Sequence, residues 1–253
     1  MAFTPEGIDQ ESLRGHAAVV IDVFRASTTI VTALVHGVCQ VVPVLTPERA
    51  RQVARAYAPD EVLLAAERGG EVVADFPYGN SPLEYVGTHV RGKVLILTTS
   101  NGTRALSAAS FADRAAVGAF VNMEGVAEWA RAQERDLVVV CAGRVGEVAL
   151  EDLVCAGMLL DILTPLGSSP ALADSARAAQ ILARYYDSDL SRLARDAAWG
   201  RELGRLGRDA DLRACLQVSI YPEVPVLLDG ILRVSPRPSA TCGDSLTSRE
   251  AAS

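Results

Sequence analysis

The chain has 253 residues, of which 49% are hydrophobic and 22% are charged, and its formal net charge is -7. This apolar content is enough to bury a core in one or two domains, and it excludes a mainly disordered chain. The basic residues are spread along the sequence without a run of like charge, which argues against a surface for nucleic acid. Any anionic ligand must therefore be held locally.

The sequence has no recognisable targeting signal or membrane span. No window approaches the roughly 20 uninterrupted apolar residues that a span requires, and acidic residues precede the first apolar run. The five cysteines form no C-x-x-C pair, which fits neither a disulfide framework nor a zinc site. We therefore expect a cytoplasmic protein without a membrane partner.

Short apolar runs alternate with helical segments along the first half of the chain. This alternation predicts a layered α/β fold with a mostly parallel or mixed central sheet. Pro43 marks the second strand as an edge strand or a bulged one. Six strands are expected early in the chain and one late strand in the segment VPVLLDG; the six lie at 19–23, 38–44, 62–66, 93–98, 115–120 and 137–141.

The second half of the chain reads as mostly helical. Residues from about 147 to 217 form either a helical subdomain or a helical flank on the sheet, within a single domain that spans residues 1–234. The polar tail at 235–253 is rich in Pro and Ser, and we expect it to be mobile.

Polar residues follow directly after four of the expected strands. Ligands of open α/β sheets bind beyond the carboxyl ends of the strands, so these segments are expected to converge. In the first segment Asp22 closes a strand, and Ser27 and Thr28 begin a helix whose free N–H groups suit a phosphate. Arg25 adds a forked donor. Alternatively, Ser27 is only a helix cap and Arg25 a surface residue.

The second segment contains Glu67 and Arg68, followed by two glycines and by the turn with Asn80 and Ser81. A carboxylate at a strand end can ligate a metal ion, and an adjacent arginine can hold an anion. The alternative is that both charged residues form the polar start of a long loop.

The third segment combines four hydroxyl side chains, an asparagine and a glycine in six residues. A helix cap needs only one hydroxyl, so this composition predicts a nest of donors for an anion. The residues are Thr98, Thr99, Ser100, Asn101, Gly102 and Thr103.

The fourth segment contains Gly143, Arg144 and the acids Glu147, Glu151 and Asp152. Glu147 and Glu151 are four residues apart, so on a helix they would share one face near its N-terminus. Acids at that position can simply complement the helix dipole. Alternatively, they point into the same cleft as the acids of the first two segments and bind Mg²⁺.

Several phosphatase mechanisms lack their motifs in this sequence. The second residue after Asp22 is Phe24, which excludes a D-x-D motif, and the sixth residue after Cys141 is Glu147, which excludes a C-x5-R loop. There is no G-x-x-x-x-G-K-[ST] or G-x-S-x-G segment either. Carboxylates, hydroxyls and arginines at the strand ends instead favour Mg²⁺ chemistry on a small anionic phosphate ester.

Four motifs in matching order give the sequence a family resemblance. The segments DVFRASTTI, ERGG followed by GNSP, TTSNGTRAL and CAGRVGEVALEDLVCAG resemble the 2-phosphosulfolactate phosphatase family, from about residue 19 to 157, with a weaker similarity at 211–225. The resemblance implies a three-layer α/β/α fold. It also implies Mg²⁺-dependent hydrolysis of phosphate esters of 2-hydroxy carboxylic acids, with 2-phospho-3-sulfolactate giving 3-sulfolactate in coenzyme M biosynthesis.

The resemblance also implies roles for individual residues, and Asp22 is the one we favour if the reaction uses a protein nucleophile. Direct attack by water and a phospho-enzyme both stay open. The candidates are Asp22, Arg25, Arg68 and Arg144 for catalysis; Ser27, Thr28, Asn80, Ser81, Thr99, Ser100, Asn101, Gly102, Thr103 and Gly143 for substrate binding; and Asp22, Glu67, Glu147, Glu151 and Asp152 for the metal.

Two other functions remain as alternatives. The first is a non-catalytic α/β module that binds or senses a small anion with the same hydroxyl turns and arginines. The second is an enzyme with Cys141 as nucleophile, which the loop spacing disfavours. A homodimer is the default expectation for the assembly.

Overall fold

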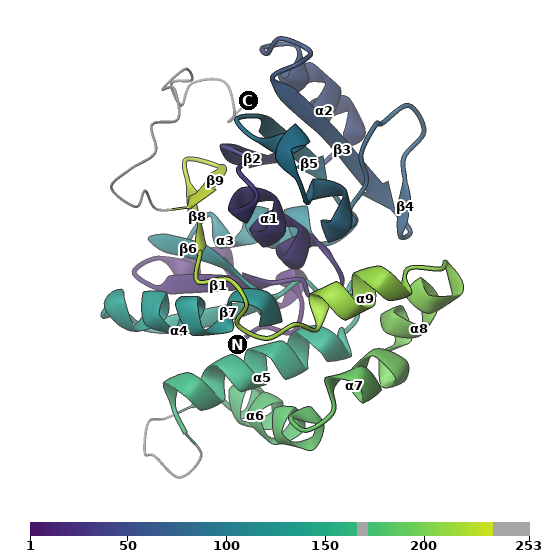
Figure 1. The fold of residues 1–253 in the computed structure, drawn as a ribbon. Helices are drawn as coiled ribbons and strands as arrows, with labels where there is room; N and C mark the ends of the chain where they lie inside the picture. The colour runs from purple at the N-terminus through teal and green to yellow at the C-terminus, as the bar shows by residue number, and fades with distance from the viewer. Residues whose placement is uncertain (166–171, 235–253) are drawn as a thin grey trace.

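The computed structural model describes residues 1–165 and 172–234 (Figure 1). The tail that the sequence predicts to be mobile lies outside the described residues. A nine-stranded mixed sheet forms the centre, in the order β4-β3-β5-β2-β9-β8-β6-β1-β7. The strands are β1 Ala17–Ile21, β2 Gln40–Pro43, β3 Val62–Arg68, β4 Glu71–Val72, β5 Val94–Thr98, β6 Arg114–Gly118, β7 Leu137–Cys141, β8 Pro225–Leu228 and β9 Ile231–Val234.

The sheet consists of two parallel parts joined by an antiparallel hairpin. Strands β3, β5 and β2 pair in parallel, and so do β6, β1 and β7. Between them, β9 pairs antiparallel with β2, and β8 pairs antiparallel with both β9 and β6. The last described segment of the chain therefore closes the middle of the sheet.

Helices cover both faces of this sheet, which gives the expected three-layer α/β arrangement. In the part of the chain that the structure describes, five helices lie between the N-terminus and the end of α5, and four follow it. They are α1 Ala26–Val35, α2 Pro47–Ala54, α3 Gly102–Ala109, α4 Met123–Ala132, α5 Leu150–Leu163, α6 Asp174–Tyr186, α7 Leu190–Asp196, α8 Ala198–Arg205 and α9 Asp209–Cys215, with short 3-10 turns at Pro5–Gly7, Gln10–Leu13, Pro82–Tyr85, Thr88–Val90 and Phe120–Asn122.

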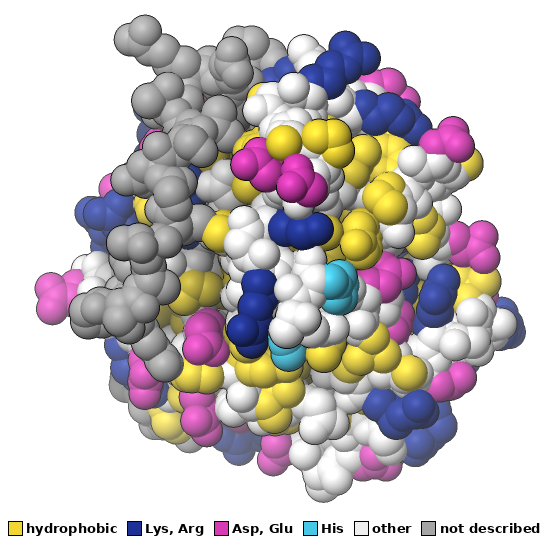
Figure 2. All heavy atoms as spheres, turned by 45° about the horizontal axis from the view of Figure 1, so that its top comes forward, with side chains coloured by type: hydrophobic (Ala, Val, Ile, Leu, Met, Phe, Trp, Pro, Cys, Tyr) yellow, Lys and Arg dark blue, Asp and Glu magenta, His cyan; other side chains and the backbone are white. Residues whose placement is uncertain are grey.

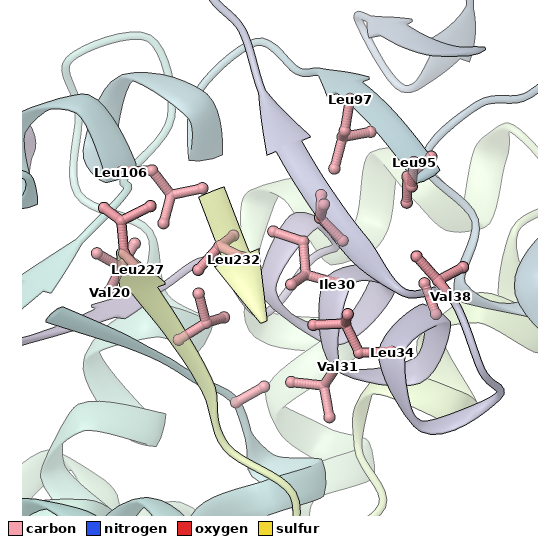
Figure 3. Packing of buried hydrophobic residues seen from close by; sticks show 14 of the residues in the cluster. Val20, Ile30, Val31, Leu34, Val38, Leu95, Leu97, Leu106, Leu227 and Leu232 are labelled. Carbon is pink, nitrogen blue, oxygen red and sulfur yellow. The ribbon is translucent and has the colours of Figure 1, made fainter. Parts of the chain in front are cut away.

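The alternation of side chains along β1 explains why the sheet needs both helical layers. Ala18 and Val20 point into a cluster with α1 and α3, whereas Val19 and Ile21 point into a cluster with α4 and α5. Successive side chains of a strand face opposite sides, so a strand that is apolar throughout requires cover on each side. Figure 3 shows the first of these clusters, where leucines from β5, β8 and β9 surround the apolar side chains of α1.

The helices after β7 share a core with the sheet. One cluster contains side chains of β1 and β7 together with Leu159 of α5, Ala183 of α6, Leu193 of α7, Leu203 of α8 and Leu212 of α9. The helical second half of the chain is therefore packed as a flank on the sheet, and Figure 1 shows it as a layer along one side of β7.

The late segment contains two strands where the sequence reading predicts one. Asp229 and Gly230 have φ values of 49° and 78°, the conformation of a type I′ turn, and they connect β8 to β9. The Asp-Gly pair is a strong hairpin signal. The two-residue β4 was also not predicted; it pairs with the end of β3.

Of the two alternatives for Pro43, an edge strand or a bulge, the edge strand is wrong. Strand β2 lies between β5 and β9. Pro43 is the last residue of β2, and within the described residues β2 pairs with β9 only where Val41 lies opposite Leu232. Since the N–H of Val44 points to β5, the missing N–H of Pro43 faces the side where pairing with β9 has already ended.

On the face shown in Figure 2, basic and acidic side chains are interspersed and neither sign forms a continuous patch. Among the helices of the described residues, none has both the length and the apolar character to cross a bilayer.

Gly157 allows the close contact between α5 and α6. A Cβ atom at this position would lie 2.0 Å from the carbonyl oxygen of Ala179. We expect Gly157→Ala to lower the free energy of unfolding by about 1–3 kcal/mol, because the helix backbones must separate. Chemical denaturation measures this change.

Gly204→Ala is the matched control. Gly204 lies in α8, and its nearest neighbour to an added Cβ is 3.7 Å away. Alanine should stabilise this helix by roughly 0.5–1 kcal/mol through backbone entropy. Similar effects of both substitutions would contradict the packing described for α5 and α6.

Candidate active site

The loops that follow β1, β3, β5 and β7 line one cavity of about 110 Å³, as the sequence reading expects. The loop before the 3-10 turn at Pro82–Tyr85 contributes to it, and so does α8. The lining residues are Asp22, Phe24, Arg25, Glu67, Gly69, Asn80, Thr99, Ser100, Asn101, Arg144, Val145 and Trp199.

Asp22 is positioned where β1 meets α1. Its backbone N–H donates to Ser27 Oγ over 2.9 Å, and its Oδ1 accepts from the N–H of Ala26 over 3.3 Å. A Cβ atom at Gly102 would lie 2.7 Å from Asp22 Oδ2 and 2.6 Å from the Cβ of Ala26. Glycine is therefore required for the start of α3 to approach the start of α1 beside this carboxylate.

Glu67 connects the loops that follow β3 and β5. Its Oε1 accepts from the N–H of Gly70 over 2.7 Å and from Ser100 Oγ over 3.2 Å, and its Oε2 accepts from the N–H of Ser100 over 3.1 Å. The carboxylate is buried and lines the cavity. Its hydrogen bonds fix the position of its charge opposite Asp22, whose pKa it raises.

Asp152 and Glu151 are buried at the start of α5. Asp152 accepts from the N–H of Val23 over 2.8 Å and from the N–H of Gly143 over 3.1 Å, so it ties the loop after β1 to the loop after β7. Neither residue lines the cavity. Each is within electrostatic range of Asp22.

Burial sets the protonation of this group of acids. Loss of hydration raises the pKa of Asp22 to about 7 and the pKa of Glu151 to about 7, and it raises the pKa of Asp152 well above its usual value. The neighbouring carboxylates add to the effect, because like charges disfavour ionisation in a medium of low dielectric constant. Asp22 thus changes protonation near neutral pH.

Glu147 does not share a helix face with Glu151, so that prediction is wrong. Helix α5 begins at Leu150, and Glu147 is exposed in the preceding turn, where its backbone exchanges two hydrogen bonds with that of Arg144. The antiparallel bridge between Arg144 and Glu147 and the extended backbone of Ala149, with φ −99° and ψ 121°, keep Glu147 out of the helix.

The three candidate arginines have different surroundings. Arg25 lines the cavity; it donates to Asp211 Oδ2 over 2.5 Å and to the carbonyl of Gly70 over 2.7 Å. Arg68 is not among the lining residues, and its guanidinium donates to Thr98 Oγ1 and to two backbone carbonyls. Arg144 lines the cavity with its guanidinium carbon 4.4 Å from the ring centroid of Trp199.

Many of the hydroxyl groups in the predicted anion nest bind the protein itself. Thr98 Oγ1 accepts from the guanidinium of Arg68, and Thr103 Oγ1 donates to the carbonyl of Thr99. In the first segment, Thr28 Oγ1 likewise donates to the carbonyl of Val23. The members that line the cavity are Thr99, Ser100 and Asn101. The other predicted substrate-binding residues, apart from Asn80, do not line it; they are Ser27, Thr28, Ser81, Gly102, Thr103 and Gly143.

The site is completed by two residues of the helical flank that are not among the predicted site residues. Asp211 of α9 binds Arg25 and accepts from Ser81 Oγ over 2.6 Å, and Trp199 of α8 lines the cavity. The weak similarity at 211–225 is a signal for Asp211. No motif marks Trp199, because it is separated from the strand-end segments by several helices.

The donor set fits a small hard cation. Within residues 1–165 and 172–234, no group of three or more His, Cys, Asp or Glu side chains is arranged as a metal site. Mg²⁺, however, needs only one or two carboxylates, since waters and phosphate oxygens complete its coordination. Asp22 and Glu67 both line the cavity, and the buried Oδ1 of Asn80 has no hydrogen-bond partner in the described part of the chain. These oxygen atoms are suitable ligands.

Cys141 is unsuited to act as a nucleophile. It is buried, and loss of hydration raises the pKa of its thiol well above the usual value. The reactive thiolate is therefore scarce at neutral pH. Cys141 does not line the cavity either.

Comparisons with known proteins agree on one family. The model of the 2-phosphosulpholactate phosphatase family matches residues 2–230. A protein of Symbiobacterium thermophilum named probable 2-phosphosulfolactate phosphatase is 40% identical over 220 residues, which cover 87% of this chain and 94% of that protein. Proteins with the same name from Caldanaerobacter subterraneus and Clostridium acetobutylicum are 35% and 34% identical over 92% and 91% of this chain and 96% and 97% of their own lengths.

The buried ion pair between Arg25 and Asp211 should be important for stability. We expect Asp211→Ala to lower the free energy of unfolding by about 3–5 kcal/mol, because Arg25 is left as an unpaired buried charge. Urea denaturation measures the change. Asp209→Ala is the control on the same helix, where an exposed side chain should cost less than about 1 kcal/mol. Equal losses in both variants would contradict the importance assigned to this pair.

Proposed function

Because the chain belongs to the 2-phosphosulfolactate phosphatase family and is a phosphoric monoester hydrolase, we propose that its substrate is the phosphate ester of a 2-hydroxy carboxylic acid. The names of its relatives favour 2-phospho-3-sulfolactate, which would give 3-sulfolactate and phosphate. The observation that carries the proposal is the cavity itself, which is lined by Asp22 and Glu67 together with Arg25 and Arg144. Carboxylates and guanidinium groups around one cavity suit a bound cation together with an anionic ester.

The proposed reaction breaks the bond between phosphorus and the ester oxygen, which leaves as the hydroxyl of the product. In one route Asp22 takes a proton from the attacking water while the leaving oxygen takes up a proton from solvent. In the other its carboxylate attacks phosphorus, the leaving oxygen is protonated by solvent, and water then hydrolyses the acyl phosphate and restores the carboxylate. The pKa of Asp22, raised to about 7, suits a general base near neutral pH. Proximity to the start of α1 holds this carboxylate in place during either route.

The remaining groups of the cavity bind and orient the ester. The N-terminal ends of α1 and α3 meet beside Asp22, where their positive dipole ends favour phosphoryl oxygens. Thr99, Ser100 and Asn101 lie at the same place. Arg25 is held rigidly by Asp211, so its position is set before substrate binds.

We further propose that the reaction depends on Mg²⁺, with Asp22 and Glu67 as its protein ligands. When bound, Mg²⁺ would neutralise charge and polarise a phosphoryl oxygen. The excess of buried acids beside the cavity supports this role for a cation.

A non-catalytic anion-binding module is less well supported. Such a module would gain nothing from carboxylates in its cavity, because they repel an anion. Asp22 and Glu67 are both among the lining residues. The expectations of a cytoplasmic location and of a homodimer stay predictions.

The direct test is phosphate release from 2-phosphosulfolactate and from 2-phospholactate. We expect turnover with Mg²⁺ and loss of turnover with EDTA that excess Mg²⁺ restores. Asp22→Asn should reduce kcat by about 100-fold or more at unchanged fold, because it loses both a base and a charged ligand. Asp60→Asn, in an exposed loop, is the control and should keep full activity.

Two outcomes would overturn the proposal. No metal-dependent turnover of either ester would exclude this reaction, and normal turnover by the folded Asp22→Asn variant would exclude Asp22 from the site. Circular dichroism of each variant establishes that it is folded.

A further inference from the structure

We infer that Trp199 determines specificity by holding Arg144 as the binding site for the second anionic group of the substrate. The inference rests on the proposed function, because it concerns the end of the ester away from the phosphate. We call the two side chains the Arg144–Trp199 pair. The chemical class of ligand is a carboxylate or sulfonate attached to the carbon skeleton of the phosphate ester.

The indole of Trp199 is fixed from two sides. Its Nε1 donates to the carbonyl oxygen of Phe24 over 2.7 Å, so the loop after β1 holds the ring from one edge. The ring also packs against the site of Gly70, where an added Cβ would lie 3.1 Å from it. Since Trp199 is half-buried and Phe24 is buried, the ring forms a firm wall of the cavity.

Arg144 is held on this wall by its planar face. The guanidinium carbon lies 4.4 Å from the ring centroid, within the range of a cation–π contact. Within the described residues this guanidinium makes no hydrogen bond or ion pair, whereas that of Arg25 is paired with Asp211 and that of Arg68 has three acceptors. A guanidinium stacked on a ring keeps its N–H edge available for a planar or tetrahedral anion.

The loop that carries Arg144 is itself well fixed. The backbones of Arg144 and Glu147 exchange two hydrogen bonds, and the N–H of Val145 donates to Asn101 Oδ1 over 3.0 Å. Arg144 is close enough to lower the pKa of the buried Glu151. Contact with the indole keeps the guanidinium of Arg144 over the cavity, although the carboxylate of Glu151 attracts it.

The charged groups lie at different depths in the cavity, and this difference separates the binding sites for the two ends of the ligand. Asp22, Arg25 and Glu67 are buried, whereas Arg144 is half-buried beside the exposed Val145. The reacting phosphate belongs with the buried groups, where Asp22 lies at the starts of α1 and α3. The Arg144–Trp199 pair lies nearer the rim of the cavity. Its guanidinium is the cationic group that a second anion can reach.

The test compares esters with and without a second anionic group in wild-type protein and in Trp199→Ala and Trp199→Phe variants. For 2-phosphosulfolactate and 2-phospholactate, Trp199→Ala should raise KM about tenfold with little change in kcat. For isopropyl phosphate, which has no second anion, KM should not change. Phenylalanine preserves a ring face and should preserve most of the affinity.

Matched variants separate specificity from a structural effect. Trp129→Phe alters a partly buried tryptophan of α4 that does not line the cavity, and it should behave as wild type. Adding Trp199→Ala to Arg144→Ala should raise KM no further, because the ring acts through the arginine. An equal rise of KM for all esters, or independent effects of the two substitutions, would overturn the inference.

Fluorescence gives a readout that does not need turnover. In the Trp129→Phe variant Trp199 is the remaining tryptophan, and 3-sulfolactate should change its emission, with the response abolished by Arg144→Ala. If no ester is hydrolysed, the proposed function fails while this titration still decides the inference. Absence of any change in the emission would overturn it.

Discussion

The carboxyl groups of Asp22, Glu151 and Asp152 are buried together where β1 and β7 lead into the site, and this concentration of acid is the constraint that the surroundings must meet. Each group loses hydration, and each raises the cost of ionising its neighbours. Backbone N–H groups of Val23, Gly143 and Ala26 offset part of this cost. Positive charge must offset the remaining cost of ionisation. The cavity provides it through arginines and, as proposed, through a cation.

The helical flank is part of the site because it supplies groups that the strand-end loops lack. Asp211 is paired with Arg25 and Ser81, so one carboxylate of α9 fixes groups from the loop after β1 and from the loop before the 3-10 turn at Pro82–Tyr85. Trp199 of α8 reaches the backbone of Phe24. Folding of the second half of the chain is therefore coupled to the geometry of a site whose motifs lie almost entirely in the first half.

Local patterns predict those parts of the fold and site that depend on neighbouring residues. Apolar runs such as 137–141 indicate buried strands, and polar residues directly after them indicate which loops meet in one cavity. The same patterns mislead where backbone conformation intervenes. The backbone bridge to Arg144 and the extended Ala149 place Glu147 outside the helix, and the Asp229-Gly230 turn divides one apolar segment into a hairpin.

Residue composition also overstates the anion nest, because a hydroxyl-rich turn looks the same whether its side chains cap helices or face a ligand. Thr28 and Thr103 bind backbone carbonyls, whereas Thr99 and Ser100 face the cavity. Asp211 and Trp199 depend on contacts between segments more than 170 residues apart in sequence, such as Trp199 with Phe24 at a separation of 175 and Arg25 with Asp211 at 186. No local pattern encodes such pairs.

Calorimetric titration of Mg²⁺ into chelator-treated protein tests most directly whether a cation balances the buried acids. With the pKa of Asp22 near 7, about nine-tenths of this carboxylate is ionised at pH 8 and about one-tenth at pH 6. Binding should therefore be about tenfold tighter at pH 8. Binding of Mg²⁺ with equal affinity at both pH values, or no binding at either, would contradict the proposed role of these carboxylates.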